Sequence, residues 1–200
     1  MPKVLSEEDV ADFRERMCAA AERMFAEHGP EAVSMRQLAA ELGVSAMTPY
    51  RYFKDKDDLL AAVRAQGFTR FAIALETAYD AEPDPAARAE VVGAAYVRFA
   101  FEHPAAYRLM FDLYQPSEGD YPELVAAAER ARRTMTAYVE ALIGAGLLAG
   151  GDARSIAHVF WASIHGLVVL KLAGKLEPGV EFDDLRRLMF AALGRGFAPA

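Results

Sequence analysis

The chain has 200 residues, 54% of them hydrophobic and 26% charged, which is typical of a folded globular protein with one or two small domains. Its net charge of −7 argues against a general nucleic-acid coat protein, and a single cysteine, Cys18, excludes an intramolecular disulfide and a cysteine-based zinc cluster. The N-terminus lacks the apolar core of a signal peptide, and the longest apolar stretch, 159–172, is shorter than the roughly 20 residues of a membrane span. We therefore expect a cytoplasmic protein with Cys18 buried as a small hydrophobe.

Apolar residues recur at helical rather than strand spacing along the chain, which predicts an all-α fold. A first helix should run from Val10 to about His28 and end at Gly29 and Pro30. Further helices beyond residue 55 are expected over 56–79, 85–102, a short stretch after His103, 123–145, 152–172 and 182–197.

Two short helices joined by a glycine turn are predicted between Ser34 and Phe53. Ser34 is a suitable N-cap for the first, Gly43 suits the turn, and Ser45 is a suitable N-cap for the second. The first helix has its apolar stripe at Met35, Leu38, Ala39 and Leu42. The second buries Pro49 and Phe53 and exposes Met47, Thr48, Tyr50 and Arg51. This pattern is the helix-turn-helix, whose second helix enters the major groove of DNA.

The segment resembles that of the TetR/AcrR-type bacterial transcriptional regulators, which carry the pattern LAxxLGVSxxxxYxYFxxKxxLL. The matching residues here are Leu38, Ala39, Leu42, Gly43, Val44, Ser45, Tyr50, Tyr52, Phe53, Lys56, Leu59 and Leu60. A second resemblance, in FWASIHGLVVLKL, is to the tryptophan-histidine-glycine signature of one branch of the family, at Trp161, His165 and Gly166. The resemblance implies a three-helix DNA-binding domain over residues 1–55 and a helical effector-binding and dimerisation domain over 56–200.

Two positions depart from the commonest family pattern, which has glycine in place of Met47 and leucine in place of Pro49. With Ser45 as N-cap, Pro49 is the first position whose N–H would close an intrahelical hydrogen bond. We therefore expect the second helix to lose one bond and still to continue from Ala46 to Phe53. The operator sequence is the property that these departures leave open.

The expected DNA-binding residues lie on or beside the exposed face of the second helix: Arg36, Ser45, Ala46, Met47, Thr48, Tyr50, Arg51, Tyr52, Lys54 and Lys56. Thr48 and Met47 suit base contacts, through a hydroxyl group and through apolar contact with a thymine methyl. The resemblance implies backbone contacts for Tyr50 and Tyr52 and a phosphate contact for Lys56, at a helix N-terminus. The alternatives are core packing for the tyrosines and a solvated surface for the lysines.

A second set of side chains is predicted to line an effector pocket: Phe101, Tyr107, Met110, Phe111, Tyr114, Trp161 and His165. Trp161 and His165 are one helical turn apart, so one cavity can include both. The alternative is that the whole set is packed core. No cofactor or metal is expected, because His158 and His165 are seven residues apart and no cysteine or carboxylate pair accompanies them.

The stretch 152–172 is apolar nearly all round, so we expect one side of this helix to pack on its own core and the other on a second subunit. The last helix would contribute Phe182, Leu185, Leu188, Met189 and Leu193. The resemblance implies a homodimer formed through a four-helix bundle from the last two helices of each subunit.

Together these features predict a sequence-specific transcriptional regulator, more often a repressor in this family, that binds a palindromic double-stranded operator as a homodimer and responds to a small-molecule effector. Its two recognition helices would occupy major grooves about 34–36 Å apart. Two other classes are a helical ligand-binding protein without DNA-binding activity and an all-α enzyme. The enzyme lacks support, since the chain has no glycine-rich phosphate loop and no nucleophile-elbow serine.

Overall fold

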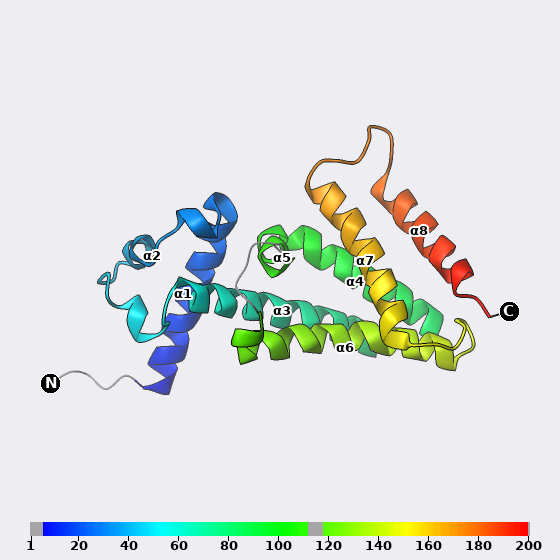
Figure 1. Cartoon of the computed structure of the whole chain (residues 1–200), viewed down its shortest axis with the longest axis horizontal. Coiled ribbons are helices and arrows are strands. Elements are labelled where there is room, and N and C mark those ends of the chain that lie inside the picture. Colours follow the sequence, from blue (N-terminus) through cyan, green and yellow to red (C-terminus); the bar gives the residue numbers. More distant parts are fainter. Residues whose placement is uncertain (1–5, 112–117, 200) are drawn as a thin grey trace. The chain divides into compact units, whose positions relative to one another are not determined.

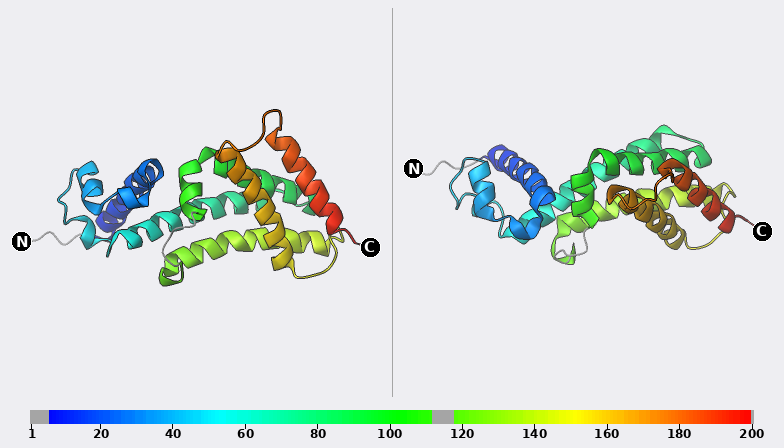
Figure 2. Two further views of the ribbon diagram at one scale, coloured as in Figure 1. Left: turned by 45° about the horizontal axis from the view of Figure 1, so that its top comes forward. Right: turned by 90° about the horizontal axis from the view of Figure 1, so that it is seen from above.

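The computed structural model describes residues 6–111 and 118–199, and its regular elements in these ranges are all helical (Figures 1 and 2). The α-helices are α1 (Glu7–His28), α2 (Met35–Glu41), α3 (Lys56–Ala81), α4 (Pro85–Glu102), α5 (Pro104–Phe111), α6 (Pro122–Gly144), α7 (Ala153–Leu172) and α8 (Phe182–Gly196). Three short 3₁₀ helices are η1 (Pro30–Ala32), η2 (Pro49–Arg51) and η3 (Glu118–Asp120). The all-α prediction is confirmed, and the one expected α-helix that is missing lies at η2.

Short polar side chains define the starts of several helices. Ser34 Oγ accepts a hydrogen bond from the Gln37 backbone N–H at 3.3 Å, and Gln37 Oε1 accepts one from the Ser34 N–H at 2.8 Å. Asp84 and Asp152 cap α4 and α7 with their carboxylates. Gly29, at a φ of 80°, ends α1. These local signals explain why the bounds follow the sequence closely.

The chain forms two compact units, and each is discontinuous in sequence. The first unit holds residues 1–70 and 105–128, and the second holds 71–104 and 129–200. Since α3 and α6 both cross these limits, each helix contributes one part to each unit. The predicted boundary after residue 55 coincides with the start of α3, and as a domain boundary it stays a prediction.

The first unit has a core made by α1, α2, the segment that precedes α3, the start of α3 and α5. Its most deeply buried members are Met17, Ala21, Phe25, Val33, Leu38, Phe53, Leu59 and Val63. Cys18 belongs to this cluster and is 2% exposed, which confirms the prediction of a buried small hydrophobe. The helix-turn-helix segment is therefore attached to a continuous apolar core.

Burial makes the Cys18 thiol unreactive, because it raises the pKa of this group to about 12 and the thiolate is the nucleophile. We expect a disulfide reagent such as DTNB to modify Cys18 in the folded protein at pH 8 at least about a hundredfold more slowly than in guanidinium chloride. Absorbance at the two conditions measures both rates. Equal rates would contradict the burial of this side chain.

In the second unit, Phe71 of α3 is fully buried against two aromatic rings of α4. Its ring centroid lies 5.1 Å from that of Tyr96 and 5.1 Å from that of Phe99. Arg130 of α6 donates from Nε to Glu76 Oε1 of α3 at 2.7 Å. Helices α7 and α8 lie side by side in all views (Figures 1 and 2).

The outer side of α7 remains uncovered within one chain. Val159, Val169 and Leu170 are each more than 40% exposed, and Leu188 of α8 is 63% exposed. Helix α7 is long and apolar enough to cross a membrane by length and composition, with a mean hydropathy of 1.5, and only 28% of that stretch is buried inside the chain. The sequence predicts burial on both sides, and the elements within residues 6–111 and 118–199 cover only one.

Gly43 turns the chain after α2 with a φ of +67°, a conformation that costs an L-residue about 1–2 kcal/mol. We expect Gly43→Ala to lower the free energy of urea unfolding by that amount, because a Cβ there meets no atom within 4 Å and only the backbone is strained. The matched control is Gly194→Ala within α8, also in open space, where alanine should stabilise by up to about 1 kcal/mol. An unchanged Gly43→Ala variant would contradict the strained turn.

Candidate nucleic-acid interface

The first half of the predicted helix-turn-helix has the expected structure. Leu38 and Ala39 of α2 are fully buried, so the apolar stripe faces the core. The turn is closed by hydrogen bonds from the Gly43 N–H to the Ala40 carbonyl at 3.0 Å and from the Val44 N–H to the Ala39 carbonyl at 2.9 Å. The chain is thereby directed into the segment 45–53.

The second half differs from the prediction, because residues 46–53 do not form an α-helix. The segment 46–52 consists of turns around the single 3₁₀ helix η2, Pro49–Arg51. Its backbone bonds are mostly of the i to i−3 type, from Thr48 N–H to the Ser45 carbonyl at 2.8 Å and from Tyr52 N–H to the Pro49 carbonyl at 2.9 Å. The predicted recognition helix is therefore wrong in its helix type.

Pro49 supplies the physical reason. In an α-helix that begins after Ser45, the proline would lack the N–H that bonds to the Ser45 carbonyl, and its ring would collide with that carbonyl. The Thr48 N–H takes this acceptor instead, one residue earlier. Proline is well suited to the first position of the 3₁₀ helix that follows, where it has no N–H to satisfy. Pro49 thus changes the backbone hydrogen bonding of the whole segment 46–52, and not only the one bond that its missing N–H would have made.

The two faces of the segment nevertheless follow the prediction. Pro49 and Phe53 are buried, with Phe53 only 1% exposed, while Met47 is 68% and Tyr50 49% exposed. Arg51 is exposed too, and Thr48 is partly exposed. Ser45 Oγ accepts from the Met47 N–H at 3.4 Å, so its side chain contacts the start of the segment as an N-cap does. We call residues 45–51 the reading segment.

Residues of α1 fix the two residues that follow the reading segment, Tyr52 and Phe53. Arg14 Nη1 donates to the Tyr52 carbonyl oxygen at 2.5 Å, and its guanidinium lies over the Phe53 ring, 4.4 Å from the centroid. The Tyr52 ring stacks on Phe13 with centroids 4.2 Å apart. For Tyr52 the structure therefore places the ring in the packing between α1 and the segment, whereas the Tyr50 ring extends into solvent.

We expect Arg14→Met to lower the free energy of unfolding by about 1.5–3 kcal/mol, because the partly buried guanidinium donates a charge-assisted hydrogen bond that methionine cannot replace. Urea denaturation measures the change. Arg16→Met is the matched control, because within the described residues Arg16 makes only an exposed pair with Asp12 at 3.6 Å, which contributes about 0–1 kcal/mol. If both variants lose equal stability, Arg14 has no special role in anchoring the segment.

The basic residues of the site are not equally available to a phosphate. Lys56 Nζ donates to the Pro30 carbonyl at 2.8 Å, and Lys54 Nζ lies 4.0 Å from an Asp55 carboxylate oxygen. In contrast, Arg36 and Arg51 are exposed and make no hydrogen bond or ion pair with any residue in the described ranges. The guanidinium groups of Arg36 in α2 and Arg51 in the reading segment are thus the better phosphate ligands.

The N-terminus of α3 is already capped by carboxylates of the chain itself. Asp55 Oδ1 accepts from the Asp58 N–H at 2.9 Å, and Asp58 Oδ2 accepts from the Lys54 N–H at 2.9 Å. The Asp58 N–H, in the first turn of α3, therefore already has an acceptor within the chain. A phosphate contact by Lys56 itself stays a prediction.

The residues predicted for an effector pocket fall into separate settings. In the first unit, Tyr107 and Met110 are 1% exposed and belong to the packed core, and the partly buried Phe111 packs edge to face on Phe68 at 5.5 Å. In the second unit, Phe101 meets Phe182 at 5.1 Å and is 37% exposed. Tyr114 lies outside the described residues.

Trp161 and His165 do come together, through a tyrosine that the sequence analysis did not select. The Trp161 indole Nε1–H donates to the Tyr96 hydroxyl at 3.1 Å, and that hydroxyl lies 3.3 Å from His165 Nδ1. Burial lowers the pKa of His165, which keeps the imidazole neutral near pH 7. Trp161 and His165 are thus close together, as predicted, and the Tyr96 hydroxyl contacts both side chains.

The second unit contains a cavity of about 560 Å³, bounded by α4, α6, α7 and α8. Its lining includes Tyr138, Phe160, Arg186 and Phe190, and it includes none of the residues predicted for the pocket. No local sequence motif distinguishes the lining of a cavity from a filled core. The sequence therefore carries no signal for this cavity.

Two family models match the chain. The model described as bacterial regulatory proteins, tetR family, matches residues 18–63, which include α2 and the reading segment. The model described as a tetracyclin repressor-like C-terminal domain matches residues 89–193. The second match alone spans more than half of the 200 residues.

Similar proteins and structures cover nearly the whole chain. An HTH-type transcriptional regulator of Mycobacterium tuberculosis is 26% identical over an alignment 208 residues long. The alignment covers 86% of this chain and 88% of that protein. A solved structure of a protein with unknown function from Rhodococcus sp. RHA1 is 31% identical, with a TM-score of 0.81 and full coverage of both chains. The TetR family transcriptional regulator PfmR from Thermus thermophilus, 19% identical with a TM-score of 0.69, covers 90% of this chain and 97% of its own and shares the fold.

Proposed function

Because this chain belongs to the tetR family of bacterial regulatory proteins, we propose that it acts as a homodimeric, cytoplasmic, effector-responsive regulator, most simply a repressor, on a palindromic operator. The family consists of transcriptional regulators and not of enzymes, and the N-terminal match is its helix-turn-helix DNA-binding part. The assignment to the branch with the tryptophan-histidine-glycine signature stays a prediction.

The observation that carries the proposal is the exposure of the reading segment beside free positive charge. Met47 and Tyr50 are large side chains that the fold leaves in solvent, and Arg51 and Arg36 have no partner in the described part of the chain. A protein without DNA-binding activity would have no evident use for such an arrangement. In the proposed complex, Thr48 and Met47 contact base edges, and Tyr50 and the two arginines contact the phosphate backbone.

Dimerisation through α7 and α8 is supported by the uncovered apolar residues of both helices, Val159, Val169, Leu170 and Leu188. A second copy would bury them in a four-helix bundle. The two reading segments would then meet successive major grooves about 34–36 Å apart. An effector bound in the C-terminal part would shift α3 and change this spacing, with a coupling typically of about 1–3 kcal/mol.

Selection of bound sequences from a random double-stranded DNA pool tests the function directly. We expect an enriched palindrome with wild-type protein at a stated salt concentration, and weaker enrichment of the same palindrome with Thr48→Ala and with Tyr50→Ala. Failure to enrich any sequence even at low salt would contradict the proposal. In that case the chain would be a helical small-ligand-binding protein.

A further inference from the structure

The cavity in the second unit is shaped to hold a small molecule with an apolar body. Its volume of about 560 Å³ falls inside the roughly 300–1,000 Å³ range of ligand pockets. Phe160 and Phe190 stack 6.0 Å apart on one side, and Leu142 and Leu148 add aliphatic surface. Gly93 of α4 contributes no side chain, and a Cβ there would lie 3.6 Å from the Phe190 ring.

Tyr138 of α6 places a polar group in this apolar wall. The residue is 9% exposed, and its hydroxyl makes no hydrogen bond with any residue that the structure describes. The ring is held edge to face on Phe160, with centroids 6.4 Å apart. Burial raises the pKa of Tyr138 well above its usual value, so the hydroxyl remains a neutral donor. Among the described residues this hydroxyl is not one of the fully enclosed polar atoms, so it can exchange a water for a ligand oxygen that accepts its hydrogen bond.

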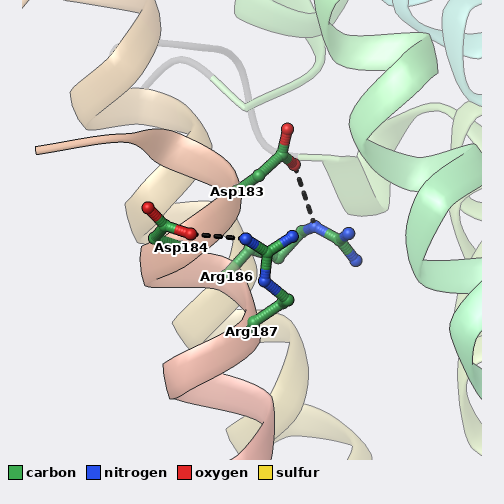
Figure 3. A network of polar contacts seen from close by, with 4 residues as sticks. All are labelled: Asp183, Asp184, Arg186 and Arg187. Atoms are coloured by element: carbon green, nitrogen blue, oxygen red, sulfur yellow. Dashed lines mark hydrogen bonds and ion pairs between the residues drawn. The ribbon is translucent and has the colours of Figure 1, made fainter.

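Arg186 of α8 provides positive charge at the edge of the same cavity. Its Nε lies 3.4 Å from Asp183 Oδ1, and both terminal nitrogens are without a partner among the described residues. Figure 3 shows the Arg186 guanidinium directed away from the α8 ribbon, with the contact to Asp183 on its near side. The neighbouring Arg187 is 68% exposed and is bound through its terminal nitrogen to Asp184 (Figure 3).

The charged residues that line the cavity are Glu90, Arg186 and Arg187, and each arginine also has an aspartate of α8 beside it, Asp183 or Asp184. Of the two arginines, Arg186 is the more buried, with 25% of its side chain exposed, and it has a free fork of two N–H donors. This fork matches the geometry of a carboxylate. The polar groups of the site therefore select for an acidic head and one further oxygen.

We propose that this cavity binds an amphipathic organic acid, with its apolar body between α4, α6, α7 and α8, its carboxylate on Arg186 and a second oxygen on the Tyr138 hydroxyl. The inference names the chemical class of the effector, and it rests on the proposed function only for the consequence that binding has for DNA affinity. Binding itself is a property of the second unit that is measured without DNA.

Isothermal titration calorimetry of the full chain with three probes of equal chain length tests the site. Decanoate should bind at least about tenfold more tightly than decanol or decyltrimethylammonium, since only the carboxylate pairs with Arg186. Addition of a hydroxyl in 10-hydroxydecanoate should strengthen binding to the wild type, and Tyr138→Phe should remove that gain while leaving decanoate affinity within about twofold. The proposal would be overturned if decanoate, decanol and decyltrimethylammonium bound equally well, or if none of them bound.

Variants locate the site on the structure. Arg186→Gln should weaken decanoate binding about tenfold and abolish the preference over decanol, whereas the matched control Arg187→Gln should change it less than about twofold. Gly93→Leu should weaken all probes alike, because its side chain enters the cavity beside Phe190. If Arg186→Gln binds decanoate as the wild type does, the carboxylate is not held there and the proposal fails.

Operator binding is measured separately, by fluorescence anisotropy with the selected palindrome. Decanoate that binds through Arg186 and leaves operator affinity unchanged would support the cavity and contradict its role in regulation. Failure of the wild type to select any DNA would contradict the proposed function, and the calorimetric result would still decide the inference about the cavity.

Discussion

Replacing Tyr50 with alanine is expected to lower the affinity for the selected operator at least about tenfold. Its exposed ring and hydroxyl lie beside Arg51 on the reading segment, where a hydrogen bond to a charged phosphate contributes about 1.5–3 kcal/mol and about 1.4 kcal/mol is a factor of ten. The proposed homodimer makes the contact twice. Fluorescence anisotropy with labelled operator at fixed salt measures the effect.

The fold should be unaffected by this change, because Tyr50 is 49% exposed and surface substitutions usually alter stability by no more than about 0.5 kcal/mol. Tyr50→Phe is the matched control, since it keeps the ring and removes only the hydroxyl. A loss of affinity in Tyr50→Phe as large as in Tyr50→Ala assigns the effect to the hydroxyl. Wild-type affinity in Tyr50→Ala would remove this residue from the interface.

Phe71→Ala is expected to lower the free energy of unfolding by about 3–5 kcal/mol, the largest change in stability considered for this chain. The Phe71 side chain is fully buried, and its ring touches Tyr96 and Phe99 in the core of the second unit. Alanine would leave a cavity there and remove two aromatic contacts. Urea denaturation followed by circular dichroism measures the loss, since α-helices dominate the fold.

Ile73→Ala serves as the control for helix propensity and position, because Ile73 lies two residues further along α3 and is 48% exposed. It should change stability by less than about 1 kcal/mol, and alanine's higher helix propensity favours it. A Phe71→Ala variant as stable as Ile73→Ala would show that the aromatic contacts of the second unit do not contribute to its stability.

Helix positions were predictable from the sequence because local chemistry determines them. Ser34 is the N-cap of α2 in the structure, as the sequence predicts, and Gly43 has the positive φ that a turn after α2 requires. Such features depend on a few neighbouring residues and need no knowledge of the tertiary fold. Accordingly, the helix expected over residues 85–102 and the observed α4 have the same bounds.

The reading segment was not predicted correctly, because the effect of Pro49 is not confined to its own missing N–H. A proline that removes the first hydrogen bond of a short helix leaves too few bonds to maintain the α form, since the predicted helix would end at Phe53. Side-chain exposure still followed the helical wheel, because 3₁₀ and α geometry differ little over a few residues. The face was therefore predictable and the hydrogen bonding was not.

The features of the site that the sequence does not predict depend on tertiary contacts. The engagement of Lys56 by the Pro30 carbonyl joins groups 26 residues apart, and the bond between Trp161 and Tyr96 joins side chains 65 residues apart. Neither periodicity nor spacing predicts which basic side chain is already hydrogen-bonded within the chain. They also do not predict which aromatic residues line a cavity. The cavity beside Tyr138 belongs to the same category, because an unfilled volume depends on the fit of four helices.

The burial of the one native thiol gives this protein a practical advantage for spectroscopy. With Cys18 enclosed in the core, a cysteine introduced by Met47→Cys, at a position 68% exposed, becomes the sole site that a maleimide spin label can reach. In a homodimer the two labels would form one symmetric pair, and pulsed electron paramagnetic resonance would read the separation of the reading segments as a distance distribution. The same sample, titrated with a candidate organic acid, would then show whether that distribution shifts or merely broadens.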